Sequence, residues 1–171
     1  MSFSLFDVPF PEHSAKSAFS GNPLERLSEN RSATCIQDAM ADPNARLFVV
    51  AVGKLLMRES NGSHDGVFKV EDLDKLAAGN GSIVLLGWDK EGAPWLAAQS
   101  DLVEEDLPTG FVALDFRSIY IQDLLGAEEL GMLAQGGALL AWHKSHAFCS
   151  RCGTKSELED GGYKRVCPNC G

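Results

Sequence analysis

Four cysteines stand in the last 23 residues of the chain and constrain how this part can fold. They form two Cys-x-x-Cys pairs, Cys149 with Cys152 and Cys167 with Cys170, separated by 14 residues. Each pair predicts a tight turn that directs two thiolates at one point, and two such turns complete a tetrahedron around Zn²⁺. We therefore expect Cys149, Cys152, Cys167 and Cys170 to bind one zinc ion in a C-terminal zinc ribbon.

The predicted zinc is structural, because four thiolates leave no open position for a catalytic water. His143 and His146 precede the first cysteine and are the alternative ligands. Since four thiols already complete the coordination, we favour another role for both. Each is expected near a helix C-terminus, where a partly protonated imidazole interacts favourably with free carbonyl groups. The fifth cysteine, Cys35, is expected to be a small buried or unreactive thiol.

The net charge of −9 is unevenly distributed: residues 1–141 carry −11 and residues 142–171 carry +2. An acidic body argues against an extended nucleic-acid interface, which needs a basic face. No apolar run approaches the roughly 20 residues of a membrane span, and the first residues lack the features of a signal peptide. We expect a cytoplasmic protein that does not contact membranes, in which reduced cysteines bind metal instead of forming disulfides.

Hydrophobic patterning predicts an α+β fold. The expected strands are residues 47–52 and 55–57 as one hairpin, 67–70, 83–88 and 94–98 as a second hairpin, and 111–114. The expected helices are residues 71–78 (ended by Gly79, Asn80 and Gly81), 119–125 and 127–146, and residues 61–66 read as a loop. Three glycines inside the last helix each cost about 1 kcal/mol relative to alanine, so Gly131, Gly136 and Gly137 predict close packing against a neighbour.

The predicted organisation has three parts. Residues 1–130 form an α+β domain with a mixed or antiparallel sheet and flanking helices, beginning with a proline-containing irregular arm over residues 1–45. Residues 131–148 form a linking helix, and residues 149–171 form the zinc ribbon.

Several other side chains are candidates for a structural or a functional role. Trp142 and Phe148 are expected to form the apolar seam between helix and ribbon. Tyr163 and Arg165 either contact a ligand or second subunit, or are ordinary exposed side chains of the ribbon hairpin. Trp88 and Trp95 are expected in the core and not as a base-stacking platform. Four acidic residues are expected to form a solvated loop and not a general acid–base pair: Asp101, Glu104, Glu105 and Asp106.

The residues around the cysteines resemble the NADH pyrophosphatases of the Nudix superfamily. Residues 142–153 read Trp-His-Lys-Ser-His-Ala-Phe-Cys-Ser-Arg-Cys-Gly, and residues 161–171 read Gly-Gly-Tyr-Lys-Arg-Val-Cys-Pro-Asn-Cys-Gly. Residues 19–26, Phe-Ser-Gly-Asn-Pro-Leu-Glu-Arg, are similar to the N-terminal segment of that family. The resemblance implies a degenerate, non-catalytic Nudix-like N-terminal domain followed by the ribbon.

The family's catalytic domain carries the box G-x5-E-x7-R-E-x2-E-E-x-G, whose glutamates bind Mg²⁺ or Mn²⁺. Glu128-Glu129-Leu130-Gly131 matches the end of this box. The same register places Phe116 where the first glutamate belongs and Leu124-Leu125 where Arg-Glu belongs. We therefore assign no catalytic residue and no cofactor-binding residue in this chain.

The resemblance implies that the chain is the front portion of an enzyme that hydrolyses NAD(H) to nicotinamide mononucleotide and AMP, and also acts on NAD-capped RNA. Divalent metal in the further domain would activate water and neutralise the diphosphate. The resemblance to this family also implies that the protein is a homodimer. We expect this portion alone to be inactive, with the chemistry encoded beyond Gly171. The alternative is a standalone zinc-ribbon adaptor that binds nucleic acid or protein.

Overall fold

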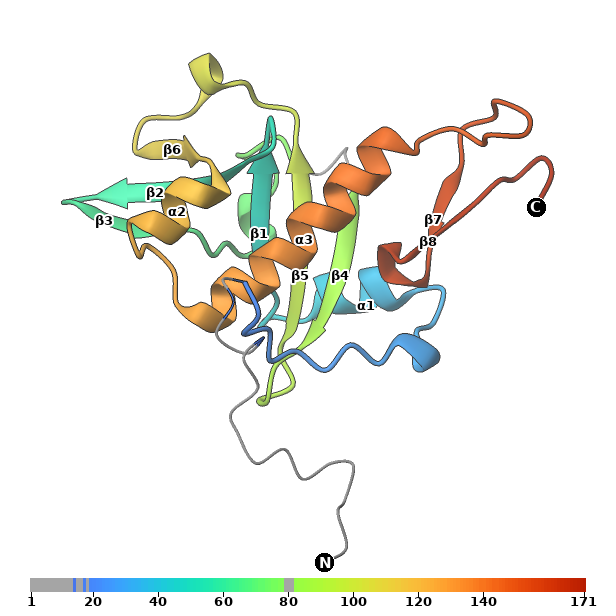
Figure 1. Cartoon of the computed structure of the whole chain (residues 1–171), viewed down its shortest axis with the longest axis horizontal. Helices are drawn as coiled ribbons and strands as arrows, with labels where there is room; N and C mark the ends of the chain where they lie inside the picture. The colour runs from blue at the N-terminus through green and yellow to red at the C-terminus, as the bar shows by residue number, and fades with distance from the viewer. Residues whose placement is uncertain (1–13, 15–16, 18, 79–81) are drawn as a thin grey trace, which may run out of the picture.

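The computed structural model describes residues 14, 17, 19–78 and 82–171 (Figure 1). Its centre is a six-stranded mixed sheet of β1 (Arg46–Ala51), β2 (Lys54–Ser60), β3 (Ser63–Asp65), β4 (Ile83–Trp88), β5 (Pro94–Ser100) and β6 (Phe111–Leu114). The strand order is β3-β2-β1-β5-β4, with β6 paired to β2. The central pair β1 and β5 is parallel, and the other pairs are antiparallel.

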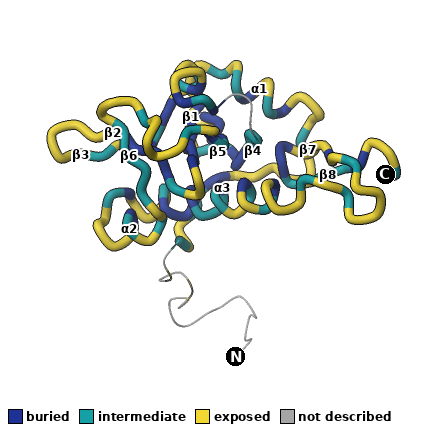
Figure 2. Tube along the Cα trace, turned by 90° about the horizontal axis from the view of Figure 1, so that it is seen from above, coloured by how far each residue is buried: buried dark blue, intermediate teal, exposed yellow. Residues whose placement is uncertain are grey.

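Among the described residues, three α-helices accompany the sheet: α1 (Cys35–Ala41), α2 (Phe116–Ile121) and α3 (Ala127–Ser145). Short 3₁₀ turns lie at Ser28–Asn30, Val70–Asp72, Glu104–Asp106 and Asp160–Gly162. Helices α1 and α3 lie on opposite faces of the sheet, as the view from above shows (Figure 2). Within the described part of the chain, no helix is both long and apolar enough to cross a membrane.

The core has two layers because successive side chains of a strand point to opposite faces. Phe48 and Val50 of β1 pack with Leu133 and Leu140 of α3 in one layer. Leu47 and Val49 pack in the other layer, beneath α1. All four strand residues are at most 3% exposed, so the central strands are apolar on both faces, as expected for a buried parallel pair.

The C-terminal segment forms a separate two-stranded sheet of β7 (Glu157–Glu159) and β8 (Lys164–Val166). It lies beside the β4 edge of the large sheet (Figure 1). The four cysteines flank this hairpin. The α+β class, the mixed sheet with its helices and the C-terminal cysteine cluster are thus confirmed.

Most of the predicted strands are confirmed. The β1–β2 and β4–β5 hairpins form with antiparallel registers, and β6 covers the predicted residues 111–114. The loop predicted over residues 61–66 is only partly right. Asn61 and Gly62 both adopt positive φ, of 51° and 79°, which suits a tight hairpin turn, and β3 then pairs back onto β2.

The prediction for residues 67–78 is wrong. Only Phe68 bridges to Leu47, so there is no strand over residues 67–70. The expected helix over residues 71–78 is replaced by a single 3₁₀ turn and further turns, and Ala77 has a φ of +46°. Leu73, Leu76 and Ala78 are each at most 4% exposed, so burial of these side chains outweighs local helix propensity. Gly79, Asn80 and Gly81, expected to end this helix, lie outside the described residues.

The predicted helix over residues 119–125 begins and ends earlier. Helix α2 starts at Phe116 because the Asp115 carboxylate accepts a hydrogen bond from the Ser118 backbone N–H at 2.9 Å, which caps the first turn. Its end is marked by Asp123, whose φ is +53°. The long final helix is confirmed as α3.

The glycines of α3 allow close packing, as predicted. A Cβ on Gly131 would lie 2.4 Å from the backbone nitrogen of Asn22, and one on Gly136 would lie 2.8 Å from the Ala97 Cβ. A Cβ on Gly137 would lie 2.2 Å from the edge of the Phe116 ring. These positions bring α3 against β5, α2 and the N-terminal segment.

Candidate zinc centre and its attachment to the sheet

The four C-terminal cysteines converge at one point. Their Sγ atoms all lie within 4.8 Å of one another. Cys149 and Cys170 are 3.6 Å apart, and Cys152 lies 3.5 Å from Cys167 and 3.6 Å from Cys170, measured between sulfur atoms. A tetrahedron with Zn–S bonds of about 2.3 Å has sulfur atoms roughly 3.8 Å apart. The donor set and its spacing therefore fit a closed Zn(Cys)₄ site.

Both Cys-x-x-Cys pairs adopt the same turn. Gly153 donates its backbone N–H to the Cys149 carbonyl at 2.9 Å, and Gly171 donates to the Cys167 carbonyl at 3.0 Å. The two glycines have φ of +72° and +79°, a left-handed conformation that glycine adopts without strain. The glycine after each pair thus turns the chain so that both thiols face the same point.

The thiols differ in acidity. Hydrogen bonds from the Thr154 side chain and backbone lower the pKa of Cys152 to about 6. Backbone N–H groups of Arg151 and Cys152 also lower the pKa of Cys149. The hydrogen bond with Cys149 raises the pKa of Cys170 to about 12. Metal binding requires all four thiols to lose their protons, and the lowered pKa values of Cys149 and Cys152 make this loss easier in the first Cys-x-x-Cys pair.

Residues 160–163, here called the docking loop, attach the ribbon to the large sheet. Gly161 and Gly162 are buried and have φ of +68° and +94°. A Cβ on Gly161 would lie 2.5 Å from Arg31 Nη1, and one on Gly162 would lie 2.5 Å from Val84 Cγ1. The backbone of the docking loop therefore approaches β4 too closely for larger residues.

Arg31 joins three parts of the chain at this point. It donates to the Leu85 carbonyl of β4 at 2.7 Å and to the Asp160 carbonyl of the docking loop at 3.3 Å. Two further bonds reach the Arg26 carbonyl in the N-terminal segment. Its guanidinium also lies 4.4 Å from the centre of the Tyr163 ring, a cation–π distance. Burial lowers the pKa of Arg31 from its usual value.

Tyr163 lies between ribbon and body and is half-buried. Its hydroxyl hydrogen-bonds to Gln135 of α3 and donates to the Leu86 carbonyl at 3.4 Å. Gln135 also donates to Leu86 and bonds to Asn22. The interpretation of Tyr163 as an exposed hairpin side chain is therefore wrong.

His143 is buried, with 2% exposure, and connects α3 to the ribbon. Its Nε2 lies 2.8 Å from the Gly162 carbonyl, which can only accept, so Nε2 carries the proton. Its Nδ1 then accepts from Arg165 at 2.9 Å. Burial lowers the pKa of His143. The expected partly protonated imidazole at a helix end is wrong for His143, because the ribbon covers it.

Of the other residues predicted at this junction, His146 lies as expected, whereas Phe148 does not. His146 does lie near a carbonyl at the end of α3, with Nδ1 3.1 Å from the Trp142 oxygen. Phe148 does not form an apolar seam, because its backbone bridges to Lys155 and its side chain is 67% exposed. Trp142 packs on the rings of His143 and His146 instead. The seam is therefore mainly polar.

The structure also tests the predicted burial of Trp88 and Trp95 and the predicted acidic loop. Trp95 is 4% exposed and donates its indole N–H to Asp89 at 3.1 Å, whereas Trp88 is only partly buried. The acidic residues 104–106 form an exposed turn, with Glu104 paired to Lys54. Cys35 is 7% exposed, as expected.

The partial match to the Nudix box has a structural explanation. Glu129 accepts a hydrogen bond from the Gly126 backbone N–H at 3.1 Å, which caps the start of α3. Glu128 and Glu129 also complement the positive end of the helix dipole. These glutamates stabilise a helix terminus, and no metal-binding cluster other than the four cysteines is found among the described residues.

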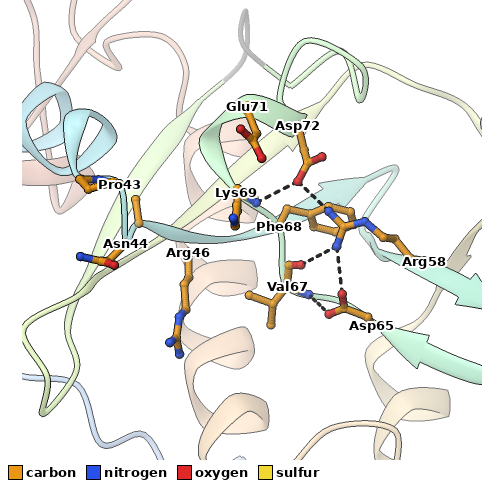
Figure 3. A pocket seen from close by; sticks show the side chains of 11 residues that line it. Pro43, Asn44, Arg46, Arg58, Asp65, Val67, Phe68, Lys69, Glu71 and Asp72 are labelled. Carbon is orange, nitrogen blue, oxygen red and sulfur yellow. Dashed lines mark hydrogen bonds and ion pairs between the residues drawn. The ribbon is translucent and has the colours of Figure 1, made fainter.

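A cavity of about 560 Å³ lies at the other end of the sheet, near β3 (Figure 3). Arg58 lines it and pairs with Asp65 at 3.0 Å and Asp72 at 2.6 Å. It also donates to the Val67 carbonyl and lies over the Phe68 ring. Its charge is already neutralised, so this cavity is held together by an internal ion-pair network.

Sequence reasoning missed Arg31 and Gln135, the two side chains that fix the docking loop to the body. Neither belongs to a recognisable motif. The consecutive glycines at positions 161 and 162 were the available signal, because tandem glycines in a small hairpin favour a close backbone approach.

Comparison with known families gives two adjoining matches. Residues 44–142 match the NADH pyrophosphatase-like rudimentary NUDIX domain, and residues 144–171 match the NADH pyrophosphatase zinc ribbon domain. Only His143, in the last turn of α3, separates the two matches.

Curated relatives agree with these matches. The human mitochondrial NAD(P)H pyrophosphatase NUDT13 is 32% identical over 100 residues, which are 50% of this chain and 27% of that protein. The NAD-capped RNA hydrolase NUDT12 of Macaca fascicularis is 49% identical over 43 residues, 25% of this chain and 9% of that protein. The human NUDT12 is 46% identical over the same length. The chain therefore covers less than a third of the length of these relatives.

Proposed function

Because this chain belongs to the NADH pyrophosphatase family, with a rudimentary Nudix domain and a zinc ribbon, we propose that it is the non-catalytic front portion of an NAD(H) diphosphatase. The observation that carries the proposal is the pair of adjoining family matches over residues 44–142 and 144–171. The much greater length of the relatives supports a further catalytic part.

In this proposal Cys149, Cys152, Cys167 and Cys170 hold one structural zinc ion. Their mutual approach within 4.8 Å supports this. The proposed division is a domain over residues 1–130, a linking helix over residues 131–148 and the ribbon over residues 149–171. No catalytic residue is assigned to this chain. The metal's role is to fold the ribbon, since a hairpin this small has too little core to fold without it.

The whole protein would hydrolyse NAD(H) to nicotinamide mononucleotide and AMP, with Mg²⁺ or Mn²⁺ in the catalytic domain. NAD-capped RNA is a second substrate in the proposal, because the relative NUDT12 is an NAD-capped RNA hydrolase. We also propose a cytoplasmic homodimer. The unpaired cysteines favour a reducing compartment.

Activity of the 171-residue chain tests the non-catalytic assignment. Incubation with NADH and Mg²⁺ or Mn²⁺ is expected to release no AMP above a protein-free control, measured by chromatography. AMP formation that tracks the purified chain would overturn the assignment. A longer product of the same gene that contains the complete box is the positive control.

The second candidate is a standalone zinc-ribbon adaptor, favoured only by the ribbon itself. The net charge of −9 opposes broad nucleic-acid binding. The gene sequence beyond codon 171 discriminates the two candidates. A Nudix box within the following hundred or so codons supports the enzyme, and a stop codon directly after Gly171 supports the adaptor.

A further inference from the structure

A cavity of about 640 Å³ lies between α3, the ribbon and one edge of the sheet. We call it the junction cavity. Val52, which follows β1, and Ser100, which ends β5, both line it. Because β1 and β5 are parallel, these two residues place the junction cavity at the carboxyl ends of both strands, whose arrows point upward in Figure 1. Clefts at the carboxyl ends of parallel strands are frequent ligand sites.

The junction cavity is lined by three cationic side chains in an otherwise acidic protein. Lys144 comes from the end of α3, and Lys155 and Arg165 come from the ribbon. Asp101 is the one carboxylate among the described lining residues. Within the part of the chain that the structure describes, none of the three cations has a carboxylate within ion-pair distance. This contrasts with Arg58 in the cavity of Figure 3, whose charge is paired twice.

Arg165 is fixed in position although it lacks an ionic partner. It donates to the Ser156 hydroxyl at 2.8 Å, to the Ser156 carbonyl at 2.7 Å and to His143 at 2.9 Å. It also donates to the Ala147 carbonyl at 3.4 Å, so one Nη1 N–H is left to bind a ligand. All four acceptors are neutral, so the positive charge of a half-buried guanidinium remains uncompensated. A rigid, uncompensated guanidinium beside two free ammonium groups is suited to bind an oxyanion.

The remaining lining limits what else such a ligand contains. Gln99 cannot hold the anion, since its amide N–H groups already donate to the Val50 and Ser100 carbonyls. A second cavity of about 300 Å³ shares Lys144 and Leu140 with the junction cavity and reaches the Phe116 ring. The two cavities therefore fit a ligand whose anionic group lies at the cations and whose flat, partly apolar group extends past Leu140 toward Phe116.

We propose that the junction cavity binds a phosphate monoester of mononucleotide size, with its phosphate between Lys144, Lys155 and Arg165. The site lies on this chain alone and does not depend on the diphosphatase assignment. It also does not require the cysteines to bind ligand, because zinc would act only by holding the ribbon in place.

Calorimetric titration of the zinc-loaded 171-residue chain at low salt tests this proposal, with AMP, adenosine and inorganic phosphate as probes. AMP and phosphate are expected to bind and adenosine is not. Lys144→Gln and Lys155→Gln are each expected to weaken AMP binding about tenfold, as loss of a charge-assisted contact does. Both lysines are exposed, so their replacement should not affect folding.

Lys164→Gln is the matched control, because Lys164 is an exposed ribbon lysine that pairs with Glu159 outside the junction cavity. It should leave AMP binding unchanged. Zinc content and thermal unfolding of each variant verify that the ribbon is intact. The proposal is overturned if AMP does not bind, if adenosine binds as tightly as AMP, or if the Lys144→Gln/Lys155→Gln double variant binds AMP like the original chain.

Discussion

His143 is the residue on which the junction between body and ribbon most depends. It is buried and hydrogen-bonded on both ring nitrogens, to the Gly162 carbonyl and to Arg165. With a cationic donor on Nδ1, the ring must stay neutral to act as the acceptor. Protonation would remove that acceptor and place two positive charges side by side. The junction is therefore built for a neutral imidazole.

We predict a stability loss in mild acid that originates at His143. Burial lowers its pKa below the unfolded value of 6.5, so the unfolded chain binds the proton more readily. The stability contribution is complete above pH 6.5 and is lost as the pH falls through the lowered pKa. Thermal unfolding between pH 7.5 and 5.5 measures this loss.

His143→Gln is the matched variant, because an amide can also donate to Gly162 and accept from Arg165 but does not titrate. It should show a shallower decrease in unfolding temperature over the same pH range. Equal slopes for both proteins would show that His143 does not control the acid sensitivity, since zinc release would affect both alike.

Helix α3 shows why some elements could be predicted. Its apolar repeat predicted the helix, and its glycines predicted close packing, because a close approach requires a missing side chain whatever the neighbour is. The neighbours themselves, Asn22 and Ala97, are distant in sequence and could not be identified. The failed helix over residues 71–78 shows the reverse case, since tertiary burial of Leu73 and Leu76 decides its conformation.

We predict that Gly131→Ala lowers the free energy of unfolding by about 1–3 kcal/mol, the usual cost of overpacking. The new Cβ would meet the backbone of Asn22, which cannot rotate away. Gly137→Ala is the control in the same helix, because its Cβ would meet only the edge of the half-buried Phe116 ring, which can turn. Urea unfolding of both variants measures the difference. An equal effect would contradict the packing explanation.

For the molecule as a whole, the sequence predicted the sheet domain and the ribbon, but not how the ribbon is attached to the sheet. The cysteine spacing indicated a ribbon, and alternating apolar residues indicated the sheet. Attachment of the ribbon depends on Arg31, Gln135 and the docking loop, which meet only after folding. The polar seam at His143 and Arg165 was missed for the same reason. Single polar side chains carry no periodic signal.

We predict that Gly162→Ala releases the ribbon from β4 without unfolding the sheet. The added Cβ would lie 2.5 Å from Val84 Cγ1, at a backbone φ of +94° that alanine rarely adopts. Amide hydrogen exchange should rise at least about tenfold in residues 156–166, whereas β1 and β5 stay protected. Gly62→Ala is the control, because Gly62 lies in the turn between β2 and β3, and its Cβ would meet nothing within 4 Å although its φ is also positive, at +79°. Equal exchange in both variants would contradict attachment through the docking loop.

The zinc content of the purified chain shows whether Cys149, Cys152, Cys167 and Cys170 form a metal site. We expect one zinc ion per chain by elemental analysis of protein kept reduced and free of chelators. We also expect Cys149→Ser to lose that zinc, because three thiolates no longer close the tetrahedron. A reduced chain that contains no zinc, or a Cys149→Ser variant that binds zinc as tightly as the original chain, would contradict the metal-site assignment.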